Sequence, residues 1–358
     1  MNIHTLFVEP ANYTQDLIEN VYQKLGISYS FFYSDSLATN NSTFISSAKH
    51  LFDKNSLWRN IIFLWECSKE NELVIINGYN HLLFMPLWLF SIVNSCIVGI
   101  ESDTPYRPKK GVKGIVKKIY LKFIFSNKQI VGLPGGSGLH RDLFRNYGMS
   151  DNRIFFLPMM VDNSKYYKEN TEKSLTNSEN LKFIFIGRLV PEKNIQLLVK
   201  SFQTVLLQGK KVELNIIGDG ICKKELHDII GENSNIKFLG KKFGADLLQF
   251  YQDAHVLVLP SNFEPWGLVV NEALATGLPV ICSSAVGAAN DLVLQPNTGW
   301  VFEDNQELEL TNLLLSIIAH PEQIIEKGKR GQEFMLNHWN YDLYTQCLKQ
   351  LMDYVKKV

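Results

Sequence analysis

Short apolar runs alternate with longer mixed segments along most of this chain of 358 residues. A continuous apolar run is typical of a strand buried on both faces. Alternation of such strands with helices predicts a parallel sheet covered by helices on both sides. In the first half we expect strands at Ile3–Val8, Ser28–Tyr33, Leu73–Ile76, Cys96–Ile100, Gln129–Gly132 and Arg153–Leu157, and helices at Thr14–Leu25, Thr43–Cys67, Leu82–Ile92 and Leu139–Tyr147.

A polar stretch, Lys165–Asn180, interrupts this alternation, and its Lys, Asn, Glu, Ser and Thr content predicts a linker. A second alternation follows the linker. Here we expect strands at Phe183–Ile186, Glu213–Ile217, Ile236–Phe238, Val256–Leu259, Val280–Cys282 and Gly299–Val301, helices at Ile195–Leu207, Lys223–Ile230, Ala245–Tyr251 and Leu268–Ala275, and a helical tail at Leu308–Lys357.

We therefore predict an α/β protein with two doubly wound, Rossmann-like domains, since the chain is too long for one ordinary core. The first domain is expected at residues 1–164 and the second at 181–335, joined by the linker 165–180. Residues 336–358 are expected to form a helix that returns to the first domain. Folds of this kind bind ligands at the carboxyl ends of their strands, which predicts a cleft between the domains.

The composition argues against several classes of protein. Lys and Arg total 36, as do Asp and Glu, so no overall charge points to nucleic acid. Five scattered cysteines without a CxxC pair argue against a disulfide framework or a zinc site and suit a reducing cytoplasm. The N-terminus lacks the pattern of a signal peptide. The most apolar stretch, His81–Ile100, is interrupted by Pro86, Asn94 and Ser95, so we expect a helix and a strand in a soluble or peripheral protein.

One candidate for chemistry lies where a predicted strand turns into a predicted helix, at Phe263–Glu272. Glu264 falls in the turn, and Pro265 and Gly267 shape it. The free amide groups at the helix start suit an anion such as a diphosphate. Taken alone, the same pattern is more often a helix cap followed by a solvated carboxylate at Glu272.

Two other loops follow the ends of predicted strands. Arg188 and Lys193 come after Gly187, and a planar guanidinium with a mobile ammonium can clamp two phosphates. A pair of solvated cations is the alternative reading of that loop. Gly218 opens a Gly-Asp-Gly run, which allows close approach of backbone or ligand or forms a plain tight turn.

The order and spacing of these loops closely resemble the C-terminal domain of the family 4 glycosyltransferases, a retaining group with the two-Rossmann-domain GT-B fold. The resemblance covers Phe183–Phe302 and rests on Gly187–Lys193, Gly218–Gly220, Lys237–Gly240, Pro260–Glu272 and Gly277–Ser283. It implies that Arg188 and Lys193 bind the diphosphate of a nucleotide-sugar donor, Glu264 the transferred sugar and Glu272 the ribose. The implied donor site also includes Gly187, Gly218, Phe238, Leu239, Trp266, Gly267, Leu268 and Val269.

The implied chemistry is physically reasonable without a metal. Arg188, Lys193 and the helix start are preorganised for the negative charge that develops on the leaving nucleoside diphosphate. We therefore expect no metal and no cofactor, the donor itself being a substrate. The resemblance also implies retention of configuration, by same-face attack in which the leaving phosphate helps to deprotonate the acceptor.

The N-terminal half departs from the family pattern. Many members have a glycine-rich loop after the first strand, where this chain has Val8–Tyr13 without a glycine. Many also have a histidine after the fourth strand, near the acceptor. Here Glu101 falls near that position and Asp103 follows two residues later, and either could orient an acceptor hydroxyl or belong to a plain turn. His81 and His140 are further acceptor-side candidates, although a structural histidine is the more common finding.

Between Arg107 and Lys128 the chain has eight basic residues and no acidic one, with apolar residues between them. The basic residues are Arg107, Lys109, Lys110, Lys113, Lys117, Lys118, Lys122 and Lys128. Such a segment can lie on an anionic membrane surface or can simply be the solvated face of a helix.

The resulting hypothesis is a cytoplasmic, peripherally membrane-associated retaining glycosyltransferase. Its donor would be a UDP- or GDP-sugar and its acceptor a glycan or a lipid-linked sugar, in bacterial-type synthesis of capsule, O-antigen or glycolipid. Two alternatives stay open: a nucleotide-sugar 2-epimerase-like isomerase of the same fold, and a catalytically silent nucleotide-sugar-binding subunit. Glu264 together with Arg188 and Lys193 favours transfer over isomerisation, whereas the missing glycine loop suggests the silent subunit.

Overall fold

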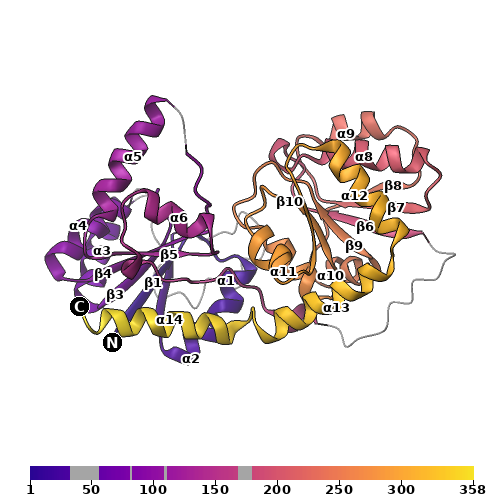
Figure 1. The fold of residues 1–358 in the computed structure, drawn as a ribbon. Helices are drawn as coiled ribbons and strands as arrows, with labels where there is room; N and C mark the ends of the chain where they lie inside the picture. The colour runs from indigo at the N-terminus through magenta and orange to yellow at the C-terminus, as the bar shows by residue number, and fades with distance from the viewer. Residues whose placement is uncertain (33–55, 81–82, 109–110, 168–179) are drawn as a thin grey trace. The chain divides into compact units, whose positions relative to one another are not determined.

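The computed structural model describes residues 1–32, 56–80, 83–108, 111–167 and 180–358 (Figure 1). This part of the chain divides into two compact units. Unit 1 comprises Met1–Asp162 and Tyr341–Val358, and unit 2 comprises Asn163–Asn340. Within the described ranges, no helix combines the length and the apolar character needed to cross a membrane.

Unit 1 is built on a parallel sheet of five strands in the order β2-β1-β3-β4-β5. Its strands are β1 (Ile3–Phe7), β2 (Ser28–Phe31), β3 (Leu73–Asn77), β4 (Ile97–Ser102) and β5 (Ile130–Pro134). Its helices are α1 (Asn12–Leu17), η1 (Ile18–Tyr22), α2 (Gln23–Leu25), α3 (Leu57–Glu70), α4 (Phe84–Asn94), α5 (Val112–Phe125), α6 (Leu139–Asn146), η3 (Asp151–Arg153) and α14 (Tyr341–Val355).

The helices α3, α4 and α5 cover one face of this sheet. Each connects two parallel strands by a step in the same direction across the sheet, and right-handed crossovers place such helices on the same side. Leu64, Leu87 and Leu121, one from each helix, are buried in the same core cluster as the apolar residues of β3 and β4. The C-terminal helix α14 lies against η1, where the hydroxyls of Tyr344 and Tyr22 are 3.0 Å apart (Figure 1).

Unit 2 is built on a parallel sheet of six strands in the order β11-β10-β9-β6-β7-β8. Its strands are β6 (Leu181–Ile186), β7 (Val212–Ile217), β8 (Ile236–Gly240), β9 (Val256–Leu259), β10 (Val280–Ser283) and β11 (Gly299–Phe302). Its helices are α7 (Asn163–Tyr166), η4 (Pro191–Lys193), α8 (Ile195–Leu207), α9 (Lys223–Ile230), α10 (Gly244–Asp253), α11 (Leu268–Ala275), η5 (Ala289–Leu294), α12 (Glu307–Ala319) and α13 (Glu322–Asn337).

Each sheet has one place where the direction of the connections reverses. In unit 1 the chain leaves β1 toward β2 and then crosses back to β3, on the other side of β1. In unit 2 the chain runs from β6 to β7 and β8 and then crosses back to β9, on the other side of β6. The loops after these adjacent strands diverge, which opens a crevice at the carboxyl ends, so β1/β3 and β6/β9 are the expected positions of ligand sites.

The observed unit boundaries differ from those expected from sequence. Unit 2 begins at Asn163, inside the expected first domain, and extends to Asn340, beyond the expected end at 335. The Asn163 side-chain amide explains this limit, because it donates to the carbonyl oxygens of Met335 (2.8 Å) and Trp339 (2.9 Å). Most of the expected linker, residues 168–179, lies outside the described residues.

The expected strand at Arg153–Leu157 is wrong. Only Ile154 forms an isolated bridge, to Gly132 of β5. The Arg153 side chain turns into unit 1 and donates to the carbonyl oxygens of Phe125 (2.8 Å) and Ile130 (3.0 Å). The amides of Phe155 and Leu157 donate to Gly132 O (2.8 Å) and Pro134 O (3.0 Å), so the segment is tied to the end of β5 without forming a strand. Residues 43–55 of the expected helix Thr43–Cys67 lie outside the described residues, and the observed helix α3 begins at Leu57.

Candidate functional site

The loops predicted to hold a donor meet at the reversal point of unit 2. Arg188 and Lys193 follow β6, and Glu264 follows the adjacent strand β9. The Lys193 ammonium and the Glu264 carboxylate form an ion pair, and each side chain is only 13% exposed. Arg188, five residues before Lys193 in the same loop, is exposed. Two candidates that are 71 residues apart along the chain are therefore in direct contact.

The glycines after β6 and β7 let two loops touch backbone to backbone. Gly218 has a φ of 146°, and a Cβ atom there would lie 1.8 Å from the carbonyl oxygen of Gly187. A Cβ atom at Gly220 would lie 2.3 Å from the carbonyl oxygen of Leu189, whose amide donates to Asp219 O at 2.9 Å. This close contact accounts for glycine at both positions, and it fixes the loop that presents Arg188.

The turn before α11 is held by its main chain. Gly287 N donates to Glu264 O at 3.0 Å, and Gly267, with a φ of 97°, takes the left-handed conformation just before the helix. The amide groups of Leu268 and Val269, in the first turn of α11, have no carbonyl partner within the helix. They carry the partial positive charge of a helix start, which suits an anion.

Trp266 is buried, so its side chain shapes the turn from inside unit 2. Its Nε1 donates to Asn271 Oδ1 at 2.8 Å, and its ring stacks on Trp339 with the ring centres 5.6 Å apart. Its carbonyl oxygen accepts from the Ala288 amide at 3.0 Å, so Trp266 supports the turn with both its side chain and its main chain.

Glu272, one turn into α11, already accepts hydrogen bonds. The hydroxyl of Tyr251 donates to Glu272 Oε2 at 2.5 Å, and Tyr166 forms a second hydrogen bond with the same carboxylate. Burial raises the pKa of Glu272, and the two tyrosine hydroxyls oppose that rise. A ribose hydroxyl would join or replace these donors.

The other predicted donor residues, Phe238 and Leu239, lie at the end of β8 and are partly exposed. The Phe238 ring lies 4.2 Å from the ring of His227 on α9, measured between ring centres. The structure thus brings Phe238 next to an imidazole that the sequence had not indicated.

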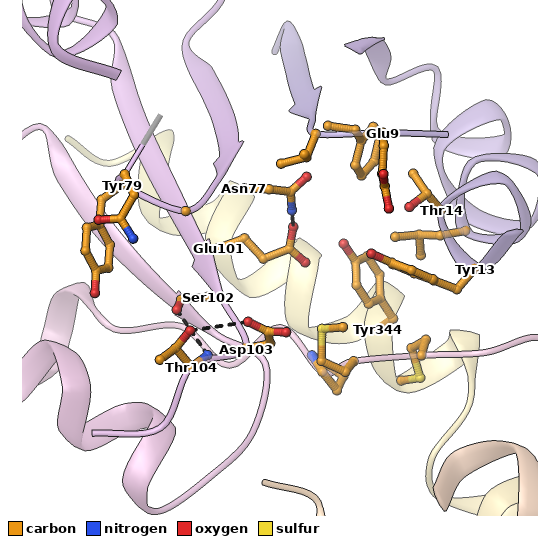
Figure 2. Close-up of a pocket in the computed structure, with 18 residues that line it drawn as sticks. Glu9, Tyr13, Thr14, Asn77, Tyr79, Glu101, Ser102, Asp103, Thr104 and Tyr344 are labelled. Carbon is orange, nitrogen blue, oxygen red and sulfur yellow. Dashed lines mark hydrogen bonds between the residues drawn. The ribbon is translucent and has the colours of Figure 1, made fainter. Parts of the chain in front are cut away.

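A pocket of about 340 Å³ lies at the reversal point of unit 1. Its walls come from the ends of β1, β3 and β4 and the loops after them, from α1, from residues 158–160 and from α14, and Figure 2 shows its side chains. The lining residues are Phe7, Val8, Glu9, Tyr13, Thr14, Leu17, Asn77, Gly78, Tyr79, Asn80, Glu101, Ser102, Asp103, Thr104, Pro158, Met159, Met160 and Tyr344. None of the described residues that line it is a lysine, an arginine or a histidine.

Glu101 is the most deeply placed carboxyl group of this pocket, with 9% exposure. The Asn77 side-chain amide donates to Glu101 Oε2, and the Gly78 amide donates to Glu101 O at 2.7 Å. Burial, together with the nearby charge of Asp103, raises the pKa of Glu101 to about 7. A carboxyl group with this pKa changes its protonation near neutral pH, as acids and bases in active sites commonly do.

The sequence predicted part of this pocket. The structure places the predicted residues Glu101 and Asp103 in the pocket lining. His140 is buried on α6, outside the pocket, and His81 lies outside the described residues. Glu9, Tyr13, Asn77 and Tyr344 were missed, although Glu9 directly follows a predicted strand and could have been noticed for that reason. Among the described residues, no group of His, Cys, Asp and Glu side chains is placed to hold a metal ion.

The helix α5 exposes an apolar stripe on the side opposite the core. Five of its apolar residues are 60–76% exposed, and their spacing places them along one helical face: Val112, Ile115, Val116, Ile119 and Phe123. Leu121, Ile124 and Phe125 occupy the opposite, buried face. The four lysines of α5 (Lys113, Lys117, Lys118 and Lys122) flank the exposed stripe, and α5 has no acidic residue.

Residues 166–332 match the family model described as glycosyl transferases group 1. Curated relatives include the capsular polysaccharide biosynthesis glycosyltransferase CapM of Staphylococcus aureus, which is 31% identical over 206 residues, 56% of this chain and 53% of CapM. An uncharacterised glycosyltransferase of Methanocaldococcus jannaschii is 33% identical over 144 residues, 39% of this chain and 37% of that protein. The chain thus spans about a third to a half of the length of these relatives.

Solved structures resemble the whole chain. HepE of Anabaena in complex with UDP has a TM-score of 0.77 at 18% identity, covering 99% of this chain and 100% of HepE. The lipopolysaccharide outer core galactosyltransferase WaaB has a TM-score of 0.72 at 16% identity, covering 100% of both chains. At this identity the likeness shows the fold alone, and it confirms the expected GT-B arrangement of two Rossmann-like domains.

The raised pKa of Glu101 predicts a stability change with pH. Its folded-state pKa of about 7 lies above its ordinary value of 4.5, so the folded chain binds a proton that the unfolded chain has already lost between those values. The stabilisation from that proton is complete below pH 4.5 and is lost as the pH rises through 7. We expect the free energy of urea unfolding of the wild type, relative to Glu101→Gln, to fall between about pH 5 and 8.

Asp103→Asn should lower the pKa of Glu101, because it removes the neighbouring charge that adds to the effect of burial. The fall in unfolding free energy should then end at a lower pH than in the wild type. Glu19→Gln, which changes an exposed carboxylate of η1, is the matched control and should leave the pH dependence intact. A difference between wild type and Glu101→Gln that stays constant across this range would contradict the assignment.

Proposed function

The chain carries a glycosyl transferases group 1 domain at residues 166–332, and on this basis we propose that it moves a sugar from a UDP- or GDP-sugar to a glycan or lipid-linked acceptor. The observation that supports this most is the contact of Lys193 with Glu264 at the reversal point of unit 2, beside the start of α11. One candidate for the phosphates and one for the sugar thus occupy the same place in the fold.

In the chain without a donor, Glu264 balances the charge of Lys193. A bound diphosphate would offer Lys193 a second anion, and Glu264 would then be free to accept a hydrogen bond from a hydroxyl of the transferred sugar. Arg188 and the amides of Leu268 and Val269 would share the charge of the phosphates. At Lys193 the donor in this proposal would take the place of Glu264 in an existing ion pair.

In the proposed reaction, the bond between the anomeric carbon and the phosphate oxygen breaks, and a bond to the acceptor oxygen forms. The electron pair stays on the leaving phosphate, whose developing charge Arg188, Lys193 and the start of α11 stabilise. The acceptor proton passes to that phosphate oxygen on the same face of the sugar, which gives retention without a metal. Glu101 and Asp103 orient the acceptor hydroxyl by accepting hydrogen bonds.

Support for the finer details comes from the relatives. CapM is named for capsular polysaccharide biosynthesis, and a relative in Corynebacterium glutamicum is named as a GDP-mannose-dependent mannosyltransferase of a phosphatidylinositol mannoside. HepE was solved with UDP-glucose. We propose by analogy a surface polysaccharide or glycolipid product made in the cytoplasm.

We also propose that unit 1 binds an anionic membrane surface through α5. Its exposed apolar stripe has lysines on both sides, which is the pattern of a helix lying in the plane of a lipid interface. Each lysine near an anionic surface contributes about 1 kcal/mol. The apolar residues add an attraction that salt does not screen.

The isomerase alternative keeps one supporting observation, the acidic pocket of unit 1.

A panel of UDP- and GDP-sugars separates the candidates. We expect slow release of free UDP or GDP from one donor, faster with an acceptor and unaffected by EDTA. A new sugar nucleotide without nucleotide release would indicate an isomerase, and binding without any product would indicate a silent subunit. A strict requirement for added Mg²⁺ or Mn²⁺ would rule out the metal-free mechanism.

Glu264→Gln should reduce transfer by ~10²-fold or more, as the loss of a preorganised polar contact does. Its nucleotide affinity should stay within a few-fold of wild type or become tighter, because Lys193 loses its competing partner. Lys193→Ala and Arg188→Ala should each reduce both the rate and the nucleotide affinity. Isothermal titration with UDP or GDP and initial rates test this, with Glu192→Gln, an exposed carboxylate of η4, as control. Collapse of nucleotide affinity in Glu264→Gln would assign that residue another role.

Co-sedimentation with lipid vesicles tests the membrane proposal. The variant Lys113→Glu/Lys118→Glu/Lys122→Glu should lose binding to vesicles containing phosphatidylglycerol at low salt, since charge attraction acts over about 10 Å at ~0.1 M salt. Ile115→Ser/Val116→Ser/Ile119→Ser should lose the part of the binding that persists at high salt. Lys200→Glu/Lys210→Glu/Lys211→Glu, exposed lysines of unit 2, is the matched charge control. Wild-type protein that ignores these vesicles at low salt would refute the proposal.

A further inference from the structure

The unit 1 pocket is small and acidic, and both properties limit what it can bind. Resting on the proposed function, we propose that it receives the terminal unit of the acceptor as a neutral or amino-bearing sugar and rejects sugars that carry a carboxylate or a phosphate. The basis is the position of Glu9, Glu101 and Asp103 around one space of about 340 Å³.

The three carboxylates come from two places in the chain. Glu9 follows β1, whereas Glu101 and Asp103 lie at and after the end of β4. Figure 2 shows the Glu101 carboxyl group in the middle of the pocket, facing the side where Tyr13 and Tyr344 lie. Glu101 is more than nine-tenths buried, and the hydrogen bond from Asn77 goes to its Oε2. Glu101 therefore forms a buried wall of the pocket, and Glu9 and Asp103 are half-buried beside the same space.

The tyrosines around the pocket respond to its negative charge. Burial of the phenol end, with the charges of Asp103, Glu101 and Glu9, raises the pKa of Tyr13 to about 12. Burial raises the pKa of Tyr344 as well, and Tyr22 and Glu101 contribute to that rise. Lys117 lies 5.5 Å from the ring centre of Tyr79, but it is not among the lining residues. The described lining thus has carboxyl groups but no cationic side chain, and Glu101 carries its negative charge mainly above pH 7.

Such a lining distinguishes ligands by charge. Carboxylates accept hydrogen bonds, so sugar hydroxyls and ammonium groups can donate to them, whereas a ligand carboxylate or phosphate brings repulsion without a donor. The walls at Phe7, Leu17 and residues 158–160 supply apolar surface for the C–H face of a sugar ring. The volume lies at the small end of ligand pockets, which fits one sugar unit better than a long chain.

Matched sugars test this without any donor. We would measure binding of methyl glucoside, methyl glucosaminide and methyl glucuronide, and of the galacto and manno counterparts, to the full chain at pH 8 by ligand-observed NMR titration. The neutral or amino member of at least one series should bind at least ~10-fold tighter than its uronide, the effect of a few like charges in a partly screened site. Glu9→Gln and Asp103→Asn should each reduce that ratio, and Glu19→Gln, outside the pocket, should not.

Equal binding of a uronide and its neutral counterpart would overturn the inference, as would the absence of binding by every neutral and amino sugar. A ratio that Glu9→Gln and Asp103→Asn leave unchanged would also overturn it, by placing the selectivity elsewhere. These results are independent of turnover. A chain that discriminates between the sugars but releases no nucleotide from any donor would refute the proposed transfer and leave the pocket assignment intact.

Discussion

Both units depend on one constraint of parallel sheets, which is that all strands end at the same edge. Loops from strands far apart in sequence are thereby brought together, and they diverge where the order of connections reverses. In unit 2 that place is β6/β9, and it joins the Arg188–Lys193 loop to Glu264. In unit 1 it is β1/β3, and it joins Glu9 to Asn77, with Glu101 on the next strand. The strand order thus determines which side chains can act together.

The two reversal points differ in charge, and this difference separates their possible ligands. In unit 2 Lys193 pairs with Glu264 in the turn before the positive start of α11, and Arg188 lies in the same loop as Lys193. In unit 1 the described lining has carboxyl groups and no cationic side chain, and burial together with the charge of Asp103 raises the pKa of the most buried of them, Glu101, to about 7. An anion therefore suits unit 2, and a hydroxyl-rich neutral or cationic group suits unit 1. This is the division that transfer from a nucleotide sugar to a sugar acceptor requires.

The sequence predicted what depends on local pattern and missed what depends on contact between distant residues. Buried strands such as Val256–Leu259 and the loops after them were identified because apolar runs and turn residues are local signals. The pairing of Lys193 with Glu264 spans 71 residues and becomes visible only once β6 and β9 are neighbours. Tyr344 could not be assigned to the pocket, because its position depends on α14 packing against η1. For α5 the sequence showed apolar and basic residues, but it could not show which apolar side chains pack into the core and which stay exposed.

The loop after β1 shows how a departure from a family pattern can carry chemical information. A glycine-rich loop at such a place lets main-chain amides approach an anion closely. Here Glu9 and Tyr13 occupy it, and Glu9 adds a negative charge to the pocket lining. Because like charges repel most strongly where water is excluded, Glu9 in this loop disfavours the binding of a phosphate there. It also adds a hydrogen-bond acceptor for hydroxyls. We infer that the missing glycines mark a change of ligand at the β1/β3 edge.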